Sequence, residues 1–157
     1  YGRHGQCARA ASNEQDRSVI MAFQTSDTVA NAMLDAFETA IGTSAVLKIY
    51  DLTAGAPANC AAAITGTVLA TITLPSDWMA GASSRSKAKS GTWQDASADN
   101  AGTADFFRLL ASDGTTCHAQ GTVTVTGGGG NLTLDNTSIA SGQSITITSF
   151  SIADNNA

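Results

Sequence analysis

Residues 122–152 read TVTVTGGGGNLTLDNTSIASGQSITITSFSI. In the runs 122–126, 131–134 and 144–152, Thr, Ser or Asn alternates with Val, Leu, Ile or Phe, and Gly-rich or Ser-Gly segments separate the runs. A period of two places the aliphatic side chains on one face of a strand and the hydroxyls on the other. Thr fits a pleated strand because its branched β-carbon packs well there. The stretch therefore predicts half-buried antiparallel strands with a polar, almost uncharged outer face.

The same alternation occurs upstream, in the runs 45–50, 67–74, 87–93, 104–111 and 116–126. Ser112-Asp113-Gly114-Thr115 predicts a hairpin turn, and Gly121 a bulge. Short strands at regular spacing with turn signals between them are typical of sandwiches. The predicted fold class is mainly β, an antiparallel β-sandwich or jelly-roll-like domain of about seven strands with one N-terminal α-helix.

The helix is predicted over about residues 27–41. Ser26 or Asp27 can cap its start, and Gly42 supplies the residue type that commonly ends a helix. Between them an apolar stripe recurs at three- and four-residue spacing: Val29, Met33, Phe37 and Ile41, joined by Ala30 and Leu34. We expect this stripe, with Leu34 and Phe37, to face the sheet, and Asp35 and Glu38 to face solvent.

Residues 1–20 lack periodicity, whereas Met21-Ala22-Phe23 reads as the start of a folded unit. The predicted organisation is an extended N-terminal arm over 1–20 and a single β-sandwich domain over 21–157. The arm carries three arginines against two acids, so it is locally basic on an acidic chain. Arg3, Arg9 and Arg17 are therefore candidate interface residues for an acidic patch on a neighbouring subunit.

Composition bounds the class of partner. The chain has 157 residues, 43% of them hydrophobic and only 13% charged, and a net charge of −5. Charged residues usually make up roughly 25% of a soluble domain. The clustered Lys and Arg that neutralise phosphates are missing, so nucleic acid is not expected as a partner. No apolar run reaches the roughly 18 residues of a membrane helix, and the first twenty residues contain no apolar leader segment. We expect no membrane partner.

Three cysteines occur, at Cys7, Cys60 and Cys117, and their spacing matches no metal or redox motif. Cys60 and Cys117 could form a disulfide if their two loops meet. Otherwise they are separate buried thiols.

No group of residues predicts an active site. Cys117 and His118 are adjacent on a predicted strand, so their side chains point to opposite faces. Gly127–Gly130 lies between strands and lacks the helix and lysine of a phosphate loop. Asp77, after Pro75, reads as a turn cap. We expect no catalytic residues, no cofactor and no metal, and a protein that is not an enzyme. Four aromatic residues could form a sugar-binding platform or belong to the core: Tyr50, Trp78, Trp93 and Phe107.

The chain resembles a family of small structural proteins of tailed bacteriophages. Residues 22–154 carry the resemblance, in the segments Asn31-Ala32-Met33-Leu34-Asp35, Ile41-Gly42-Thr43-Ser44-Ala45, Ala56-Pro57-Ala58-Asn59-Cys60, Leu74-Pro75-Ser76-Asp77-Trp78-Met79, Lys87-Ala88-Lys89-Ser90-Gly91-Thr92-Trp93, Phe107-Arg108, Cys117-His118-Ala119-Gln120-Gly121-Thr122-Val123, Leu134-Asp135-Asn136 and Gly142-Gln143. The family pattern starts near Met21, so the arm departs from it. The resemblance implies a virion component and carries no catalytic residues.

From the resemblance and the weakly charged composition we expect a capsid decoration (cement) protein that binds the outer head surface. Many modest contacts across subunit junctions would hold it there. The alternatives are a tail, neck or fibre component, or a carbohydrate-binding module for host attachment. The expected partners are the major capsid protein or other virion subunits, with self-association on the particle. The expected location is the virion, assembled in the cytoplasm of the bacterial host.

Overall fold

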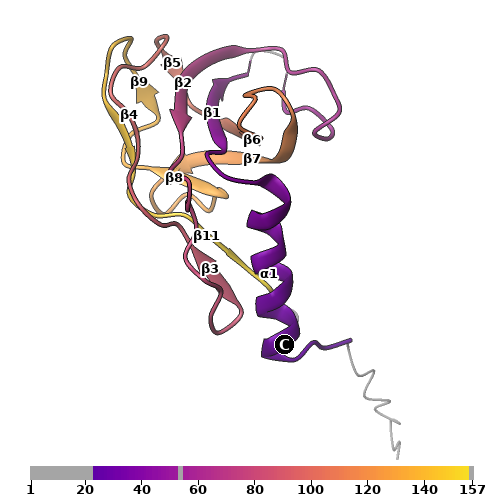
Figure 1. The fold of residues 1–157 in the computed structure, drawn as a ribbon. Coiled ribbons are helices and arrows are strands. Elements are labelled where there is room, and N and C mark those ends of the chain that lie inside the picture. Colours follow the sequence, from indigo (N-terminus) through magenta and orange to yellow (C-terminus); the bar gives the residue numbers. More distant parts are fainter. Residues whose placement is uncertain (1–22, 53–54, 156–157) are drawn as a thin grey trace, which may run out of the picture.

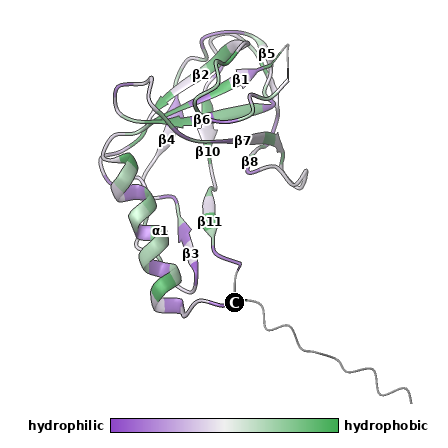
Figure 2. Cartoon of the chain, turned by 90° about the vertical axis from the view of Figure 1, so that its right-hand side faces the viewer, coloured by the Kyte–Doolittle hydropathy of each residue, from purple (hydrophilic) through white to green (hydrophobic). Residues whose placement is uncertain are grey.

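A helix and a narrow β-ribbon project from a β-rich body in the computed structural model, which describes residues 23–52 and 55–155 (Figure 1). The projection, here called the stalk, consists of α1 (Asp27–Ile41), the hairpin over residues 79–89 that contains β3 (Ser86–Ala88), and β11 (Ser151–Ala153). The other strands form the β-body. The views in Figures 1 and 2 both place the stalk on one side of the β-body, with α1 along its outer edge.

Local signals set the ends of α1 at the predicted residues. The Ser26 hydroxyl accepts a hydrogen bond from the backbone N–H of Val29, and Asp27 places a negative charge in the first turn. Both features stabilise a helix N-terminus. The chain leaves the helix at Gly42, whose φ of 89° is readily adopted by glycine alone, and the Gly42 N–H donates to the Glu38 carbonyl.

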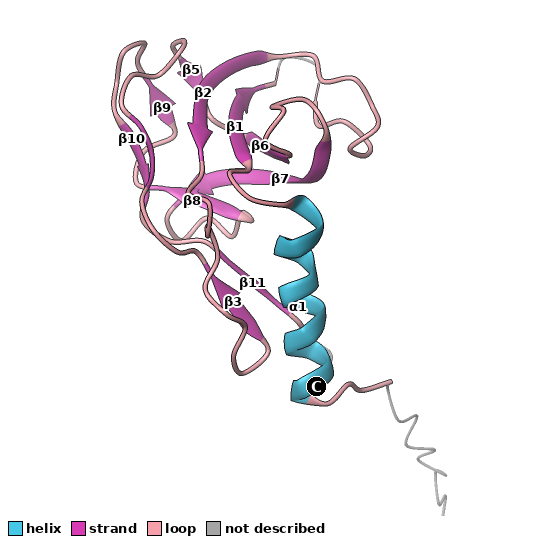
Figure 3. Cartoon of the chain, in the orientation of Figure 1, coloured by secondary structure: helices cyan, strands magenta, loops and turns pink. Residues whose placement is uncertain are grey.

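One five-stranded sheet forms the centre of the β-body, in the order β2-β1-β6-β7-β8 (Figure 3). Its strands are β1 (Val46–Asp51), β2 (Thr67–Thr73), β6 (Phe106–Leu110), β7 (Cys117–Val125) and β8 (Leu132–Leu134). The neighbours pair antiparallel except β7 and β8, which run parallel. The prediction of a purely antiparallel sheet is therefore wrong at this edge.

Three shorter strand pairs complete the structure: β4 (Trp93–Asp95) with β10 (Ile145–Ile147), β5 (Gly102–Thr103) with β9 (Ser138–Ile139), and β3 with β11. The Asp95 carboxylate accepts the backbone N–H of Thr71, which joins β4 to the edge strand β2. Side chains from the central sheet and from these outer pairs meet in one hydrophobic cluster, which includes Leu47, Ile72, Trp93 and Ile147. The core therefore lies between two β layers, as in a sandwich.

The second face of the central sheet is covered by the loop over residues 55–66. Arg108 on β6 is only 7% exposed and donates from its guanidinium to the carbonyls of Ala62 and Asn59, at 2.7 and 3.3 Å. Gln120 on β7 donates to the Pro57 carbonyl at 2.8 Å. A disulfide joins Cys60 of the loop to Cys117 of β7, with 5.2 Å between the Cα atoms. Because β6 is buried on both faces, it is apolar without interruption except at Arg108.

The run Gly127–Gly130 makes a tight connection between the parallel strands β7 and β8. Gly127 and Gly129 have φ of 84° and 79°, values that disfavour any residue with a Cβ. Gly128 and Gly130 pass against Thr124, where an added Cβ would lie 2.9 and 2.7 Å from its hydroxyl oxygen. Thr124 accepts the Gly130 N–H at 2.9 Å. Glycine is thus required twice by conformation and twice by close approach.

A chain of aromatic contacts connects the stalk to the β-body. Phe37 of α1 lies edge-on to Trp78, with ring centroids 6.2 Å apart, and Trp78 lies 6.0 Å from Trp93. Phe150 then lies 5.4 Å from Trp93 and 6.1 Å from Phe107 of the central sheet. These pairs lie in the range of favourable tilted and edge-to-face contacts. Aromatic side chains therefore fill the junction between the stalk and the β-body.

The structure confirms the predicted mainly β class with one helix ahead of the strands. The described residues form 11 strands, more than the seven predicted, because two alternating runs divide between partners and because β5 and β9 lie in segments predicted as loops. The run 144–152 splits into β10, which pairs with β4, and β11, which pairs with β3. The run 87–93 likewise divides between β3 and β4. The predicted arm, with Arg3, Arg9 and Arg17, lies outside the described residues, as does Cys7.

The predicted bulge at Gly121 is wrong, because Gly121 pairs directly with Phe107. A Cβ at residue 121 would lie 2.8 Å from a ring carbon of Phe107 and 2.8 Å from the Asn131 side-chain oxygen, so glycine serves close packing there. The register of β6 and β7 shifts where Leu109 faces Ala119 and Leu110 faces Cys117. His118 is therefore the extra residue, and its side chain is exposed.

Candidate interaction surface

Three side chains of α1 accept hydrogen bonds from three backbone N–H groups of the hairpin beside it. The acceptors are spaced by four and three residues, which places them on one side of a helix. The donors are spaced by three residues along the hairpin. The bonds run from the Met79 N–H to Glu38 Oε1 at 3.0 Å, from the Ala82 N–H to Asp35 Oδ1 at 2.9 Å, and from the Arg85 N–H to Asn31 Oδ1 at 2.9 Å. Side chains of the helix thus supply the hydrogen-bond acceptors for three backbone N–H groups along this edge of the hairpin.

Lys87 on β3 places its ammonium group inside the stalk. The side chain is 3% exposed, and Nζ lies 2.8 Å from Asp35 Oδ1 and 3.0 Å from Glu38 Oε2. It also donates to the Ala80 carbonyl at 2.8 Å, so all three ammonium hydrogens have an acceptor. Burial alone would lower the pKa of Lys87, but the bonds to Asp35 and Glu38 outweigh burial and raise that pKa. The hydrogen bond from Lys87, helped by the Ala82 N–H, lowers the pKa of Asp35.

Arg85 holds the tip of the stalk together. Ser84 and Arg85 both have positive φ, 50° and 62°, in the tight turn of the hairpin. Such values are uncommon for residues with a side chain, so other contacts must stabilise the turn. The guanidinium supplies them by donating to the Thr25 carbonyl at 2.8 Å and by pairing with Asp154 at 2.8 Å and Asp27 at 3.3 Å.

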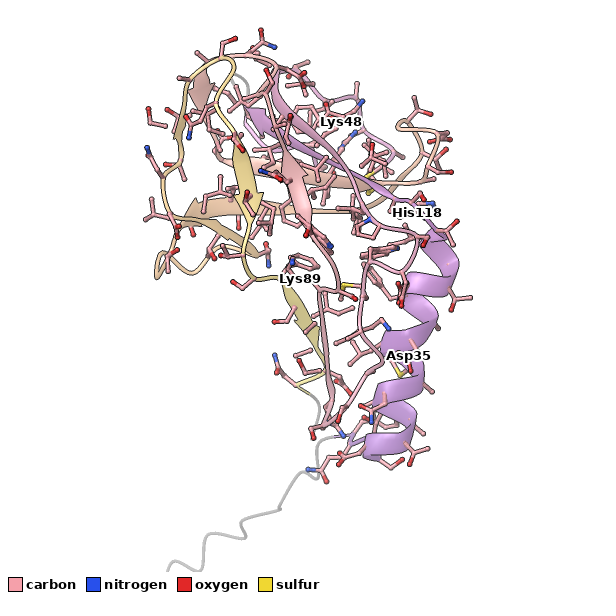
Figure 4. The ribbon with its side chains drawn as sticks, turned by 60° about the vertical axis from the view of Figure 1, so that its left-hand side comes forward. Asp35, Lys48, Lys89 and His118 are labelled. Atoms are coloured by element: carbon pink, nitrogen blue, oxygen red, sulfur yellow. A yellow bond between two sulfur atoms is a disulfide. The ribbon has the colours of Figure 1, made fainter. Side chains whose placement is uncertain are left out.

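The expectation that Asp35 and Glu38 face solvent is confirmed for Asp35, whereas the Glu38 side chain is only 19% exposed. Half of the Asp35 side chain is exposed, but both carboxylates are committed to Lys87 and to the hairpin backbone. Figure 4 marks Asp35 on α1 and Lys89 where the stalk meets the β-body. Lys89 donates to the Gly91 carbonyl at 2.7 Å and lies 5.6 Å from the centre of the Trp93 ring.

The predicted apolar stripe of α1 is only partly covered. Ala30 and Ile41 are buried, and Leu34 and Phe37 are half-buried. Val29 and Met33, which we expected to face the sheet, are 48% and 59% exposed. The core lies on the side of Ala30, Leu34, Phe37 and Ile41, about a quarter turn around the helix from Val29 and Met33.

The exposed apolar residues form a continuous line on the outside of α1, here called the outer strip: Val29, Met33, Ala36 and Ala40. Large apolar side chains exposed elsewhere in the described part of the chain are few. Phe23, Val29 and Met33 account for three of the four, and Val125 is the fourth. Exposure of large apolar groups is thus concentrated at the helix and the residues leading into it, which is typical of an interaction surface.

A groove of about 880 Å³ lies between the central sheet and β11, at the base of the stalk. Phe107, Leu109, Ala119 and Phe150 supply apolar lining, and Thr133, Thr148, Ser149 and Ser151 supply hydroxyls. Lys89 is the titratable residue among those that line it, and its ammonium is bound to the Gly91 carbonyl. The lining is thus a mixture of apolar side chains and hydroxyl groups with one ammonium group at its border.

Of the two alternatives for the four aromatic residues, the structure confirms the core and not a surface platform. Tyr50, Trp78, Trp93 and Phe107 are 5%, 0%, 0% and 4% exposed, so these rings serve the core. Among residues 23–52 and 55–155, no three His, Cys, Asp or Glu side chains are grouped so that they could hold a metal ion. In the same residues no helix is long and apolar enough to cross a membrane.

The sequence prediction did not include Lys87, Arg85 and the acceptors on α1 as a unit. One signal could have found part of it. Asn31, Asp35 and Glu38 form a polar row at four- and three-residue spacing immediately beside the apolar residues, where an exposed helix face would usually carry mixed charges. The partner of that row lies more than forty residues away in the sequence, so no local pattern identifies it.

Comparison of the chain with protein-family models, with curated proteins and with solved structures finds no match.

Proposed function

We propose that this chain is a structural subunit of a tailed-bacteriophage virion, a capsid decoration protein that binds the outer surface of the head. The role is one of assembly and not of catalysis. Its partners in this proposal are the major capsid protein and further copies of the chain itself.

The observation that carries the proposal is the stalk. Its four acidic side chains pair with Arg85 or Lys87 inside the stalk: Asp27, Asp35, Glu38 and Asp154. The outward surface is left to small or apolar residues, namely the outer strip of α1 and, on the β-ribbon, Ser86, Ala88, Ser151 and Ala153. A projection whose charges pair with one another, and whose outer helix face is apolar, is suited to being covered by other protein.

The disulfide in the β-body also supports a role in a particle exposed to the environment. Disulfides persist in oxidising surroundings and are rare in the reducing cytoplasm. A virion is assembled in the cytoplasm but acts outside the cell. The Cys60–Cys117 bond would then form or persist after release, and would fix the loop over 55–66 on the sheet.

The experiment is quantitative gel densitometry of purified virions of the phage that encodes the chain. A decoration protein is expected in hundreds of copies per particle, at a fixed ratio to the major capsid protein. A few copies per particle would favour the tail, neck or fibre alternative. Absence of the chain from purified particles would refute a virion role.

In this proposal the arm over residues 1–20 binds a neighbouring subunit through its positive charge. Arg3, Arg9 and Arg17 would contact an acidic patch of a neighbouring subunit, with a contribution that salt weakens. Deleting residues 1–20 should leave the domain folded and reduce its retention on particles, more strongly at low salt, where the charges of the arm contribute most. Equal retention of the truncated and full-length chains would show that attachment depends on the domain alone.

A further inference from the structure

We propose that the outer strip of α1 packs against the outer strip of a second copy of this chain. The inference deepens the assembly role proposed above, since it names a partner for the uncovered face of the stalk. It does not require a virion for its test.

The spacing of the outer strip suits packing between two helices. Val29, Met33, Ala36 and Ala40 are separated by four, three and four residues. This is the repeat that keeps one seam of a helix facing a partner over successive turns. At 100° per residue, the four positions lie within an arc of about 60°. Val29 and Met33 supply large side chains toward one end, whereas Ala36 and Ala40 allow the backbones to approach closely at the other.

The distribution of charge favours a second copy as the occupant. A contact between identical faces brings like residues together, so charges on or beside the face would repel. The three acids of α1 lie on the other side of the helix, where they pair with Arg85 and Lys87. The outer strip is bordered by Thr28, Ala32 and Thr39 on one side and by Ala30 and Phe37 on the other, all uncharged. A charged partner would find no counter-charge here, whereas an identical strip meets no repulsion.

Within residues 23–52 and 55–155, the position of α1 leaves the outer strip accessible. The hairpin and β11 lie beside the helix on its inner side, and both views place α1 at the edge of the stalk (Figures 1 and 2). Val29 and Met33 are therefore exposed although their own chain buries Ala30 and Ile41 on the same helix. The two copies would meet stalk to stalk, and each β-body would stay free to contact other subunits.

The first experiment is sedimentation equilibrium of the full chain over a wide concentration range. We expect reversible self-association of the natural sequence and a dissociation constant at least about tenfold weaker for Met33→Glu, corresponding to about 1.4 kcal/mol. Ala140→Glu is the matched control, because it adds the same charge at an exposed position of the β-body, outside α1. Circular dichroism of each variant checks that the helix is retained. A natural chain that is monomeric throughout, or equal weakening by both substitutions, would overturn the proposal.

The second experiment tests the geometry directly. Ala36 lies near the middle of the outer strip, so it meets its own equivalent whether the two helices are parallel or antiparallel. In a Cys7→Ser background, Ala36→Cys should form an interchain disulfide under mild oxidation, and Thr39→Cys should not. Equal cross-linking at residues 36 and 39 would contradict a specific seam. A chain that is abundant in particles but fails both tests would leave the virion role standing and remove the self-association.

Discussion

The ammonium nitrogen of Lys87 lies 2.8 Å from the carboxylate of Asp35, although the two residues are 52 positions apart in the sequence. The contact connects β3 to α1 inside the stalk. The same carboxylate also accepts the Ala82 N–H, so Asp35 fixes α1 to the hairpin through both a side chain and the backbone.

Replacing Lys87 by Met should loosen the stalk. The methionine keeps much of the apolar length but removes three hydrogen bonds and leaves Asp35 and Glu38 without a cation. We expect a loss of about 1–3 kcal/mol in the free energy of unfolding, below the value for a fully buried pair because both carboxylates reach solvent. Urea denaturation measures it. Lys89→Met is the control and should cost less, since the Lys89 ammonium has one carbonyl partner outside the α1–β3 contact. An equal loss of unfolding free energy for the two variants would show that the contacts of Lys87 with α1 do not stabilise the stalk.

Acid should weaken the same contact. The pKa of Asp35 is lowered in the folded chain from its ordinary 3.8, chiefly by the hydrogen bond from Lys87. Its stabilisation is therefore complete above about pH 4 and is lost as pH falls through the lowered pKa. The pKa of Lys87 is raised above 10.5, so its contribution is lost only at strongly alkaline pH. Asp105 acts oppositely, because burial raises the pKa of its carboxyl group.

The comparison with Asp35→Asn isolates this effect. Asparagine can still accept from Ala82 but does not titrate. Thermal midpoints measured from pH 7 down to pH 2 should converge for the two proteins as the natural carboxylate becomes protonated. A constant difference between the two curves would show that the charge of Asp35 does not stabilise the fold.

Phe37→Ala tests the packed side of the helix. The ring is partly exposed and contacts Trp78 edge-on. We therefore expect a loss of about 2–3 kcal/mol, smaller than the roughly 3–5 kcal/mol of a fully buried phenylalanine. Met33→Ala on the same helix should leave the stability of the isolated subunit almost unchanged, because its side chain is 59% exposed. If both substitutions shift the melting midpoint equally, the outer strip is covered within the subunit itself.

The disulfide should contribute to stability through the length of chain that it closes. Cys60 and Cys117 are separated by 57 residues. In the chain-entropy model a loop of this length corresponds to about 4 kcal/mol. We expect a loss approaching that value for the double variant Cys60→Ser, Cys117→Ser in guanidinium titration. Mass spectrometry of the unreduced chain should show the two cysteine peptides linked, and free, alkylated Cys60 and Cys117 would contradict the bond.

Gly130→Ala should destabilise the connection between β7 and β8. The new Cβ would lie 2.7 Å from the Thr124 hydroxyl oxygen and 3.0 Å from the Thr124 backbone nitrogen, so the backbone must shift. Overpacking of this kind costs about 1–3 kcal/mol. Gly81→Ala is the matched control, since a Cβ there meets nothing within 4 Å. The comparison needs only two melting curves, and coincident midpoints would mean that the loop absorbs the methyl group.

Sequence reasoning was most accurate where local rules decide the outcome. The bounds of α1 followed from Ser26 and Gly42, because capping depends on residues within one turn. It failed where the outcome depends on which distant strand a segment pairs with. The alternation over residues 144–152 continues through Phe150, yet the chain changes partners there, since Phe150 turns between Trp93 and Phe107. The parallel pairing of β7 with β8 was missed because alternation predicts strands but does not fix the direction in which two strands pair.

The candidate surface shows the same limit. The apolar arc of α1 spans about 160°, from Ala36 to Leu34. Period and composition are equal along that arc, so the sequence could not say which part the chain covers itself. The inward placement of Lys87 depends on Asp35 and Glu38, whose distance from it in the sequence hides the pair.

The closing contact of the stalk has a mechanical consequence. The Thr25 hydroxyl donates to the Asp154 carboxylate at 2.9 Å across 129 residues, so both ends of the described chain leave the molecule at one point. A force that pulls these ends apart would first load Arg85 and then open β11 from β3 one rung at a time. The β-body, with its disulfide, lies outside that line of force. A tether at the stalk tip would therefore yield in small steps while the β-body kept its shape.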